Sequence, residues 1–476
     1  MKSRHLLAIY HRLPPPARSV AATAQGLWLR FWRNGRRSRR LQHEALERET
    51  WSDAQWTAWR EERLAHTLHR AATRVPYYRA QWEDRRRRGD GSSWERLENW
   101  PILEKDAVRR QPRAFVADDR HPRLMYHERT SGTTGASLEL WRSRSTVEQL
   151  FAIARLRTAG WHGLPAGVRW ARLGGQLVTP VSQRQPPFWV WNAAMRQLYM
   201  SAYHLAPDLI RHYLDALRQY RITTLTGYPS ALYALAWGAL RLGRTDLVMH
   251  AVITSAEPLP DEQRSVLEAA FQCPVRETYG MAENVAAASE CPAGRLHQWP
   301  EFGWIEVLNG RDAAPPGTPG DLVCTALLNE DMPLIRYRVG DRGAFAPEGR
   351  TCPCGRTLPV ITGIDGRTGD VLVMPDGRRL ARFGPVFHGL PIRESQIVQE
   401  AIDRFRVVVA PDAGFDDGAA RRIVERLRDR AGDVIVTVER VEAVPRTASG
   451  KLRSVVCLLD ADPGGYTLQR AGAAAG

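Results

Sequence analysis

The sequence has no apolar run of the length that a membrane-spanning helix needs. Such a helix takes about 18–20 consecutive, mostly apolar residues, and no stretch of that kind occurs among the 476 residues. The opening segment, MKSRHLLAIYHRLPPPARSV, is basic but has neither a sustained apolar core nor a clean cleavage site, so it does not match a secretory signal peptide. We therefore expect a cytoplasmic protein.

Cysteine is scarce, and its spacing does not favour disulfides. Two of the six cysteines form Cys352-Pro-Cys354, a pair too close for an ordinary disulfide and well placed to share a metal ion. The chain also lacks internal repeats and any motif for nucleic-acid binding. We expect no nucleic-acid partner.

Positive charge is present in excess. The chain has 67 Lys and Arg against 52 Asp and Glu, a net charge of +15, which suits anionic substrates, nucleic acid or an anionic membrane surface. The densest cluster is LWLRFWRNGRRSRR, residues 27–40, where aromatic residues precede four arginines. This segment could make a peripheral membrane contact, but a docked helix followed by a solvated charge run is the favoured interpretation.

Length and composition allow more than one domain, since 43% of the residues are hydrophobic. Between residues 208 and 280, helix-like segments with apolar residues three or four apart alternate with β-like runs such as ITTLTGYP and VRETYG. This alternation predicts an α/β fold with helix-covered β-sheets, parallel or mixed, and ligand loops at the strand ends.

A glycine-rich joint, GIDGRTGD at 363–370, precedes a segment of different texture. There RFRVVVAP and DVIVTVERV are typical of strands around a helix, as in a small α+β domain. We expect an N-terminal domain over residues 1–369, with a basic, aromatic extension over 1–60, and a C-terminal domain over 370–476.

The loop RTSGTTGAS follows the β-like run RLMYHER and lacks the lysine of a P-loop. Its backbone amides and hydroxyls could approach an anion closely, although the same residues suit an ordinary surface turn. The candidate residues are Thr130, Ser131, Gly132, Thr133, Thr134 and Gly135.

Three later segments follow this loop in order: ETYGMAE (277–283), PLIRYRVGD (333–341) and VPRTASGKLR (444–453). Together they resemble the adenylate-forming superfamily of acyl-CoA synthetases and adenylation domains, especially the phenylacetate–CoA ligase branch and its capsule-biosynthesis ligase-like relatives. Further matching pieces are RAATRVPYYR, WPILEKDAV, LTGYPSAL, ITSAEPLP, CPCGRTLPVITGIDGRTGD and SQIVQE. The resemblance covers nearly the whole chain between residues 60 and 460.

The resemblance implies a two-step reaction. A carboxylate attacks the α-phosphate of ATP, which gives acyl-AMP and pyrophosphate. The C-terminal domain then rotates as a mobile lid, and a thiol, usually that of coenzyme A, attacks the acyl-AMP. The implied cofactors are ATP, Mg²⁺ and coenzyme A, and the substrate is a small carboxylic acid.

The resemblance also assigns roles to single residues. The loop from Thr130 to Gly135 would hold the triphosphate, and Asp341 would accept hydrogen bonds from the ribose. Adenine would lie against Tyr279 and the stretch Ala256, Glu257 and Pro258. The remaining roles are Glu283 for Mg²⁺, Lys451 as the mobile cation at the attacked phosphate, Arg367 facing the nucleotide, Gly369 as the hinge, and Tyr228 with Pro229 beside the acyl pocket. Each residue taken alone also suits a structural role, such as a turn cap or a surface charge.

Three departures from the family pattern bear on this assignment. Ala282 replaces a hydroxyl residue that contacts the α-phosphate, and loss of one such donor costs roughly 10²–10³ in rate. Gly369 replaces the usual Asp or Lys of the hinge, which is compatible because glycine tolerates large changes in φ and ψ. Ala136 and Ser137 stand where relatives often have Pro or Lys, so the loop alone is weaker evidence than Lys451.

Two cysteine-bearing segments, ECPAGRLH and TCPCGR, predict a metal clip. Cys291, His297, Cys352 and Cys354 offer three thiolates and one imidazole, a normal set of ligands for structural Zn²⁺. Some members of the resembled branch carry a similar arrangement. The alternative is a group of buried thiols without a metal.

Two other functions remain open. The acyl group could pass to an amine, a hydroxyl or a carrier-protein thiol in polysaccharide or natural-product biosynthesis. Alternatively, Ala282 and the basic first segment suit a non-catalytic nucleotide-binding assembly factor, although the retention of Lys451, Asp341 and Arg367 argues against it.

Overall fold

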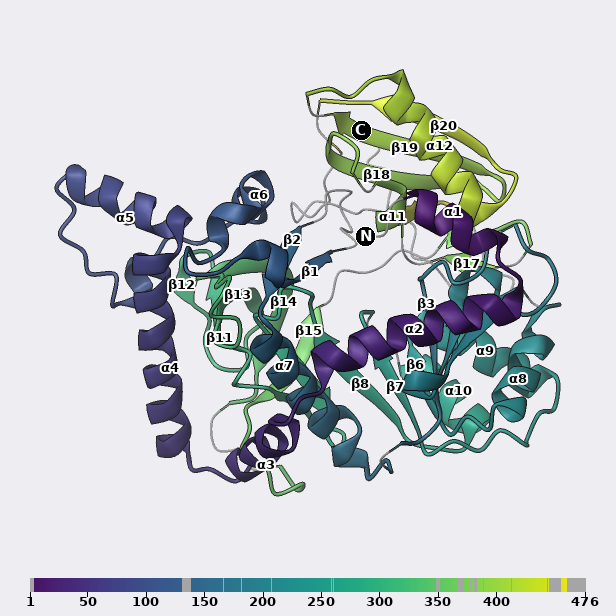
Figure 1. Ribbon diagram of the computed structural model, residues 1–476, viewed down its shortest axis with the longest axis horizontal. Helices are drawn as coiled ribbons and strands as arrows, with labels where there is room; N and C mark the ends of the chain where they lie inside the picture. Colours follow the sequence, from purple (N-terminus) through teal and green to yellow (C-terminus); the bar gives the residue numbers. More distant parts are fainter. Residues whose placement is uncertain are drawn as a thin grey trace, which may run out of the picture.

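The computed structural model describes residues 4–130, 138–165, 167–180, 182–206, 208–257, 259, 261–347, 352–365, 372–376, 378–380, 383–387, 389–411, 413–442, 444 and 455–459. Figure 1 shows a body built on one long sheet, with a smaller unit of C-terminal strands at the top of the view. The predicted α/β fold class is confirmed.

Helices form the chain before the first strand. Ser52 begins α4 with a capping box, because its hydroxyl accepts from the Gln55 N–H and the Gln55 side chain accepts from the Ser52 N–H. Pro76 occupies the first turn of α5, where a proline does no harm, so the long helix stops just before it. The bounds are α1 Arg4–Arg12, α2 Pro15–Arg33, α3 Ser38–Arg48, α4 Asp53–Arg74, α5 Pro76–Arg87 and α6 Lys105–Arg110, with 3₁₀ turns at Leu97–Asn99, Pro112–Phe115 and Pro122–Leu124.

The basic segment at residues 27–40 begins within a docked helix. Helix α2 lies along the edge strand β4 (Trp189–Asn192), and the exposed arginines at 36, 37, 39 and 40 follow it. The docked helix and the exposed arginines that follow it agree with the favoured interpretation, while a membrane contact by the outer side of this segment is not tested by these contacts. No helix within the described ranges is long and apolar enough to cross a membrane.

A hairpin of two strands, β1 (Tyr126–Arg129) and β2 (Glu139–Arg142), flanks the predicted phosphate loop. The long sheet then begins with a parallel part in the order β8-β7-β6-β3-β5, and β4 closes its edge in the antiparallel sense. The strand bounds are β3 Trp170–Gly174, β5 Gln197–Ser201, β6 Thr224–Gly227, β7 Ala251–Ser255 and β8 Val275–Gly280.

Helices cover the parallel part, as the alternating pattern predicts. Tyr213 and Leu217 of α8, Leu235 of α9 and Leu267 of α10 are fully buried against strand residues such as Val252. These helices are α8 Ile210–Gln219, α9 Pro229–Arg241 and α10 Asp261–Phe271, while α7 (Arg144–Thr158) links the hairpin to the sheet and short 3₁₀ turns occupy Gly160–His162, Ala193–Met195 and Ala202–His204.

The other half of the sheet is antiparallel. It continues from β8 in the order β9-β10-β15-β14-β13-β11-β12. The bounds are β9 Ala287–Glu290, β10 Leu296–Gln298, β11 Gly303–Asn309, β12 Asp312–Ala313, β13 Gly320–Ala326, β14 Tyr337–Phe345 and β15 Val360–Asp365. The strand that carries Tyr279 and the strand that carries Asp341 therefore belong to the same continuous sheet.

The C-terminal strands form a separate sheet in the order β20-β19-β18-β21. Helix α12 buries Ile423 and Leu427 against Val407 and Phe405 of this sheet, which matches the predicted α+β texture. Buried Arg378 joins this unit to the body, since its guanidinium donates to the carbonyls of Tyr203 and Arg430. The bounds are β16 Leu372–Val373, β17 Arg379–Leu380, α11 Gly384–Phe387, β18 Ile392–Ala401, β19 Arg404–Pro411, α12 Asp417–Ala431, β20 Ile435–Arg440 and β21 Val455–Cys457.

Candidate functional site

Tyr279 and Asp341, predicted to hold adenine and ribose, meet in the structure. Tyr279 lies in β8 and Asp341 in β14, and the tyrosine hydroxyl donates to Asp341 Oδ2 at 2.9 Å. Both residues are half-buried. A carboxylate fixed in this way at the surface of the sheet can accept hydrogen bonds from a sugar diol.

The predicted adenine loop has an unusual backbone. Ala256, directly after β7, has φ of +73°, a left-handed conformation that is uncommon for a residue with a side chain. The loop continues with half-buried Glu257, while Pro258 lies outside the described residues. Such strain collects at ligand sites, so the loop stays a candidate for holding the nucleotide base.

Glu283, the predicted Mg²⁺ ligand, is a buried carboxylate rather than a solvated charge. Its Oε1 accepts from the Tyr337 hydroxyl at 2.9 Å and lies 3.4 Å from Lys105 Nζ. The preceding Ala282 presents its carbonyl to the guanidinium of Arg142. These contacts of the Glu283 side chain and the Ala282 carbonyl hold the end of the ETYGMAE segment in place.

Lys105 is a site residue that sequence reasoning missed. A usable signal is in the composition, because only 3 of the 67 basic residues are lysines: Lys2, Lys105 and Lys451. In a chain that otherwise uses arginine, a lysine marks a place where a compact, mobile ammonium group is suited better than a planar guanidinium. One of the three contacts Glu283, and another is the predicted catalytic lysine.

The described part of the predicted phosphate loop ends at Thr130. Its N–H donates to the Leu138 carbonyl at 2.9 Å, and its hydroxyl accepts from the Leu138 N–H at 2.8 Å, which closes the base of the loop. The other predicted loop residues, Ser131, Gly132, Thr133, Thr134 and Gly135, lie outside the described residues, as do Arg367, Gly369 and Lys451. Their roles stay predictions.

Tyr228 and Pro229 begin α9 at the end of β6, with the proline in the first turn. Tyr228 belongs to a group of tyrosines around Gly175, since a Cβ on that glycine would lie 3.3 Å from the Tyr203 hydroxyl and 3.6 Å from the Tyr228 hydroxyl. A Cβ on the adjacent Gly174 would lie 2.4 Å from the hydroxyl of Tyr199, where burial raises the pKa to about 12. The glycine pair was not recognised from the sequence, although two glycines after a strand are a signal for close approach.

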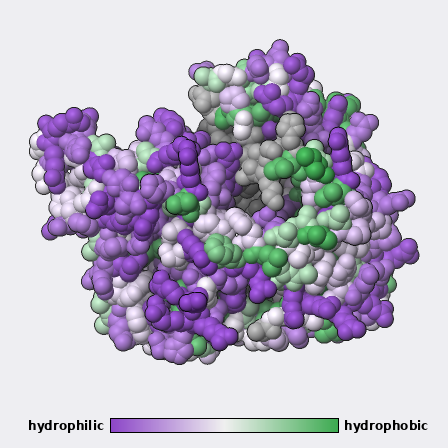
Figure 2. Space-filling model, viewed as in Figure 1, coloured by the Kyte–Doolittle hydropathy of each residue, from purple (hydrophilic) through white to green (hydrophobic). Residues whose placement is uncertain are grey.

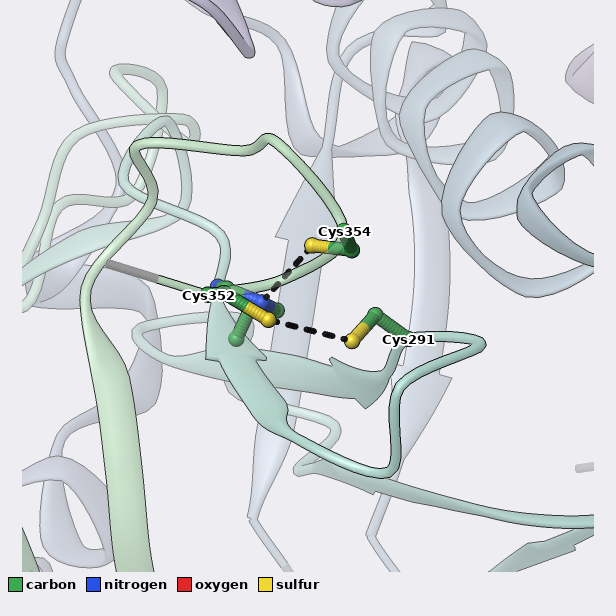
Figure 3. A group of neighbouring side chains, drawn as sticks. Cys291, Cys352 and Cys354 are labelled. Carbon is green, nitrogen blue, oxygen red and sulfur yellow. Dashed lines mark hydrogen bonds between the residues drawn. The ribbon is translucent and has the colours of Figure 1, made fainter. Parts of the chain in front are cut away.

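The four predicted metal ligands converge. The ligand atoms of Cys291, His297, Cys352 and Cys354 all lie within 4.8 Å of one another. Cys291 Sγ is 3.7 Å from Cys352 Sγ, and Cys354 Sγ is 3.4 Å from His297 Nε2. Figure 3 shows the three cysteine side chains pointing toward a common centre from two loops.

The histidine of this cluster is oriented as a ligand requires. His297 Nδ1 lies 2.9 Å from the Leu358 carbonyl, so Nδ1 carries the proton and Nε2 keeps its lone pair toward the thiols. Burial lowers the pKa of His297, which keeps the imidazole neutral. Three thiols and a neutral imidazole, mostly buried, fit a tetrahedral Zn²⁺ ion.

A buried charge network supports the cluster from behind. Glu49 accepts from Trp161 Nε1 at 2.7 Å and from Arg356 Nε at 2.8 Å, and Arg157 joins Glu49 to Glu301. Burial would raise the pKa of Glu301, but Arg157 holds it below its ordinary value. The network connects the end of α3 to the loop that carries Cys352 and Cys354.

The chain is similar in sequence to several known proteins. A family described as the CapK C-terminal domain matches residues 376–457. The chain is 27% identical over 380 residues to Protein CapK of Staphylococcus aureus, which covers 75% of this chain and 79% of the relative. It is 23% identical over 461 residues to phenylacetate–coenzyme A ligase of Thermus thermophilus, with 87% and 98% covered.

Solved structures show the same fold. The structure of 2-hydroxyisobutyryl-CoA ligase in complex with 2-HIB-AMP and CoA, in the thioesterification state, matches with a TM-score of 0.56 at 19% identity, over 86% of this chain and 91% of that one. The same ligase in its postadenylation state matches with a TM-score of 0.53 at 21% identity.

Proposed function

We propose that the chain is a member of the adenylate-forming superfamily, and that it activates a carboxylic acid with ATP and transfers the acyl group to a thiol, which its likeness to CapK and to phenylacetate–CoA ligases supports. In the first step a carboxylate oxygen bonds to the α-phosphorus of ATP, and pyrophosphate leaves. In the second step a thiolate sulfur bonds to the acyl carbon, and AMP leaves. We take coenzyme A as the thiol.

The observation that carries this proposal is the contact between Tyr279 and Asp341. These residues are 62 positions apart in the chain, yet one hydrogen bond of 2.9 Å joins them. The tyrosine ring offers a flat partner for adenine, and the carboxylate offers acceptors for the ribose hydroxyls. Two side chains that suit different parts of adenosine are thus in direct contact.

The charges around Glu283 support a place for the triphosphate. We propose that Glu283 binds Mg²⁺, since carboxylate oxygen is a hard ligand of the kind this ion prefers. The ion would neutralise phosphate charge when bound. Lys105 and the Tyr337 hydroxyl hold the same carboxylate oxygen and so fix its orientation.

Catalysis of the first step is assigned to the lid. We propose that Lys451 stabilises the negative charge that develops at the α-phosphate and that Arg367 contacts the nucleotide beside the hinge at Gly369. We also propose a structural Zn²⁺ ion held by Cys291, His297, Cys352 and Cys354, away from the reacting atoms. A cytoplasmic location and the domain boundary near residue 369 stay predictions.

The acid and the acceptor are tested together by one screen. Purified protein with ATP and Mg²⁺ is given aryl, aliphatic, amino and sugar acids, and pyrophosphate release is measured for each. We expect release with one class of acid, and then acyl transfer from the preformed acyl-AMP to coenzyme A. Transfer only to an amine, a hydroxyl or a carrier-protein thiol would replace coenzyme A as the acceptor, and no release with any acid would favour a non-catalytic nucleotide-binding protein.

A variant of the lid lysine tests the mechanism. Lys451→Ala should lower pyrophosphate release by roughly 10²–10³ while ATP binding, followed by calorimetry, stays nearly unchanged. Lys2→Ala is the matched control, because it removes a lysine that is not assigned to the site. An unchanged rate in Lys451→Ala contradicts the mechanism.

A further inference from the structure

Helix α2 turns its apolar residues to solvent. The exposed residues of α2 lie at helical spacing. Apart from Arg30 at the margin, they fall within one arc of about 120° around the helix axis. They are Pro16, Val20, Ala24, Leu27, Trp28 and Phe31. A surface helix ordinarily has the reverse arrangement, with the apolar side packed against the protein.

The side of α2 that packs against the body is polar and small. The Ser19 hydroxyl accepts from the Trp191 N–H at 3.2 Å, and the Thr23 hydroxyl accepts from the Ala193 N–H at 3.1 Å. A Cβ on Gly26 would lie 2.2 Å from Asn192 Oδ1, so the helix approaches the edge strand closely at this point. Trp28 also contacts the body, since its ring stacks on Tyr126 with centroids 5.6 Å apart, but 47% of the residue remains exposed. Polar residues therefore serve much of the docking, and the apolar residues of the outer side stay largely exposed.

Helix α1 extends the exposed apolar surface. Its Tyr10 hydroxyl donates to the Val178 carbonyl, which holds the helix to the body, while Leu6 and Ile9 are exposed. Six of the 15 large, exposed hydrophobic residues in the described ranges are Leu6, Ile9, Val20, Leu27, Trp28 and Phe31, which we call the α1–α2 apolar face. Figure 2 shows hydrophobic residues following α1 and α2 across the front of the molecule.

Positive charge accompanies this face. Residues 1–43 contain ten Lys and Arg and no Asp or Glu. Directly after α2, the exposed arginines at 36, 37, 39 and 40 follow one another, and the first acidic residue, Glu44, pairs with Arg40 at 3.2 Å. An apolar face next to a basic run is complementary to a surface that is apolar inside and anionic outside.

We propose that the α1–α2 apolar face docks the protein on an anionic lipid bilayer. Val20 and Leu27, exposed at 70% and 59%, would enter the boundary between headgroups and acyl chains. Trp28 and Phe31 suit the same depth, since amphipathic rings collect at the headgroup level. The arginines after α2 would lie among the anionic headgroups.

A second copy of the chain fits this face less well. Two copies meeting there would bring two basic runs together, and like charges across an interface oppose association. A bilayer of anionic lipid has the opposite charge and an apolar interior. Apolar insertion and electrostatic attraction would act together, as stable peripheral binding requires.

The test is co-sedimentation of the full chain with vesicles. We expect binding to vesicles of phosphatidylcholine with about one-third phosphatidylglycerol, weaker binding in high salt because the charges are screened, and little binding to pure phosphatidylcholine. The triple variant Ile9→Gln, Val20→Gln, Leu27→Gln should lower the partition coefficient roughly 100-fold, because each exposed side chain contributes about a factor of five. Circular dichroism and unfolding should match the unaltered chain.

Two matched controls sharpen the result. Leu240→Gln, Leu242→Gln, Val248→Gln alters other exposed apolar residues, at the end of α9 and in the loop after it, and should leave vesicle binding unchanged. Arg36→Gln, Arg37→Gln, Arg39→Gln should weaken binding roughly five-fold per arginine, while Arg86→Gln, Arg87→Gln, Arg88→Gln at the C-terminal end of α5 should not.

Three outcomes overturn the proposal. The first is no binding to anionic vesicles, and the second is binding that the α1–α2 triple variant leaves unchanged. The third is a dimer in light scattering that the same triple variant converts to a monomer, which would assign the face to a second copy. Activity in the acid screen is independent of all three.

Discussion

At the scale of single residues, the contacts around the predicted nucleotide site join segments that lie far apart in the chain. Tyr279, Asp341 and Glu283 were recognised because their residue types suit a nucleotide and lie in matching segments. Tyr337 and Lys105, the partners of Glu283, and Arg142, which donates to the Ala282 carbonyl, come from positions 54 or more residues away and could not be found by spacing alone. The scarcity of lysine is the exception, since composition alone could have drawn attention to Lys105.

The hydrogen bond between Tyr279 and Asp341 predicts a defect in ATP binding. Tyr279→Phe removes a donor to the carboxylate, worth about 1 kcal/mol, and should raise the KM for ATP roughly five-fold with little change in kcat. Asp341→Asn should have a larger effect. Tyr220→Phe, where the tyrosine ring lies 5.2 Å from that of Trp191 in a tilted arrangement, is the control. Pyrophosphate release at varied ATP concentration measures each value, and an unchanged KM in both site variants contradicts the assignment.

The ion pair of Lys105 and Glu283 predicts that Lys105, like Lys451, contributes to the handling of ATP. A cation beside the predicted Mg²⁺ ligand lies where the negative triphosphate is expected. Lys105→Ala should raise the KM for ATP by roughly ten-fold or more, and Lys105→Arg should restore part of the affinity because it restores the charge. A purely structural lysine would instead lower stability in Lys105→Ala and leave the KM unchanged.

Glu277 predicts a stability that depends on pH. Burial, together with the charge of Glu290, raises the pKa of Glu277 from its ordinary 4.5 to about 7. The folded protein therefore keeps a proton that the unfolded chain loses between pH 4.5 and 7, and stability falls as pH rises through that window. Glu277→Gln should be more stable than the unaltered chain at pH 8, by roughly 2 kcal/mol.

Denaturant unfolding of both proteins at pH 4.5 and pH 8 checks this effect. The difference in unfolding free energy between Glu277→Gln and the unaltered chain should be large at pH 8 and small at pH 4.5. The N–H of Leu259 bonds the Glu277 side chain, and glutamine retains an acceptor for it. An equal difference at both pH values would contradict a raised pKa.

At the scale of elements, periodicity located the helices and strands between residues 208 and 280, and long-range pairing was out of reach. The alternating pattern of residues 208–280 correctly predicted α8, β6, α9, β7, α10 and β8. No local pattern states that β10 pairs with β15, which brings His297 and the cysteine loop together. The metal ligands were found through their chemistry and not through this pairing.

The Cys/His cluster predicts a metal that stabilises these elements. Purified protein should contain one zinc per chain, and Cys354→Ser should lose most of it and unfold at a lower temperature, since ligand binding adds directly to folding free energy. Cys457→Ser, which alters a half-buried cysteine outside the cluster, is the control. Elemental analysis and thermal unfolding measure both, and protein without zinc but with reduced thiols would contradict the site.

At the scale of the whole molecule, the proposed two-step chemistry would use two arrangements of the C-terminal unit. The sequence predicted a small α+β unit after a glycine-rich joint, and the separate sheet of β18 to β21 agrees with its texture. Its position against the body was not predictable, because it depends on buried contacts such as those of Arg378 with Tyr203 and Arg430.

The predicted hinge leads to a test that separates the two half-reactions. Gly369→Pro restricts φ and should leave one half-reaction within about ten-fold of normal while the other falls by roughly 100-fold or more. Gly369→Ala is the milder control. Pyrophosphate release and transfer from preformed acyl-AMP are measured separately. Equal retention of both half-reactions in Gly369→Pro would exclude residue 369 as the hinge.

The charge network behind the Cys/His cluster also limits how far the chain can be shortened. Glu49 lies outside the part of the sequence that resembles the ligases, yet it is buried and accepts hydrogen bonds from Trp161 and Arg356. A chain that began at Ser52 would remove the carboxylate to which Arg356 Nε donates, while Arg157 would keep its two hydrogen bonds to Glu301. Removing one partner of a buried ion pair is destabilising, so we expect such a chain to unfold at a lower temperature, whatever surface the outer side of the first 50 residues recognises.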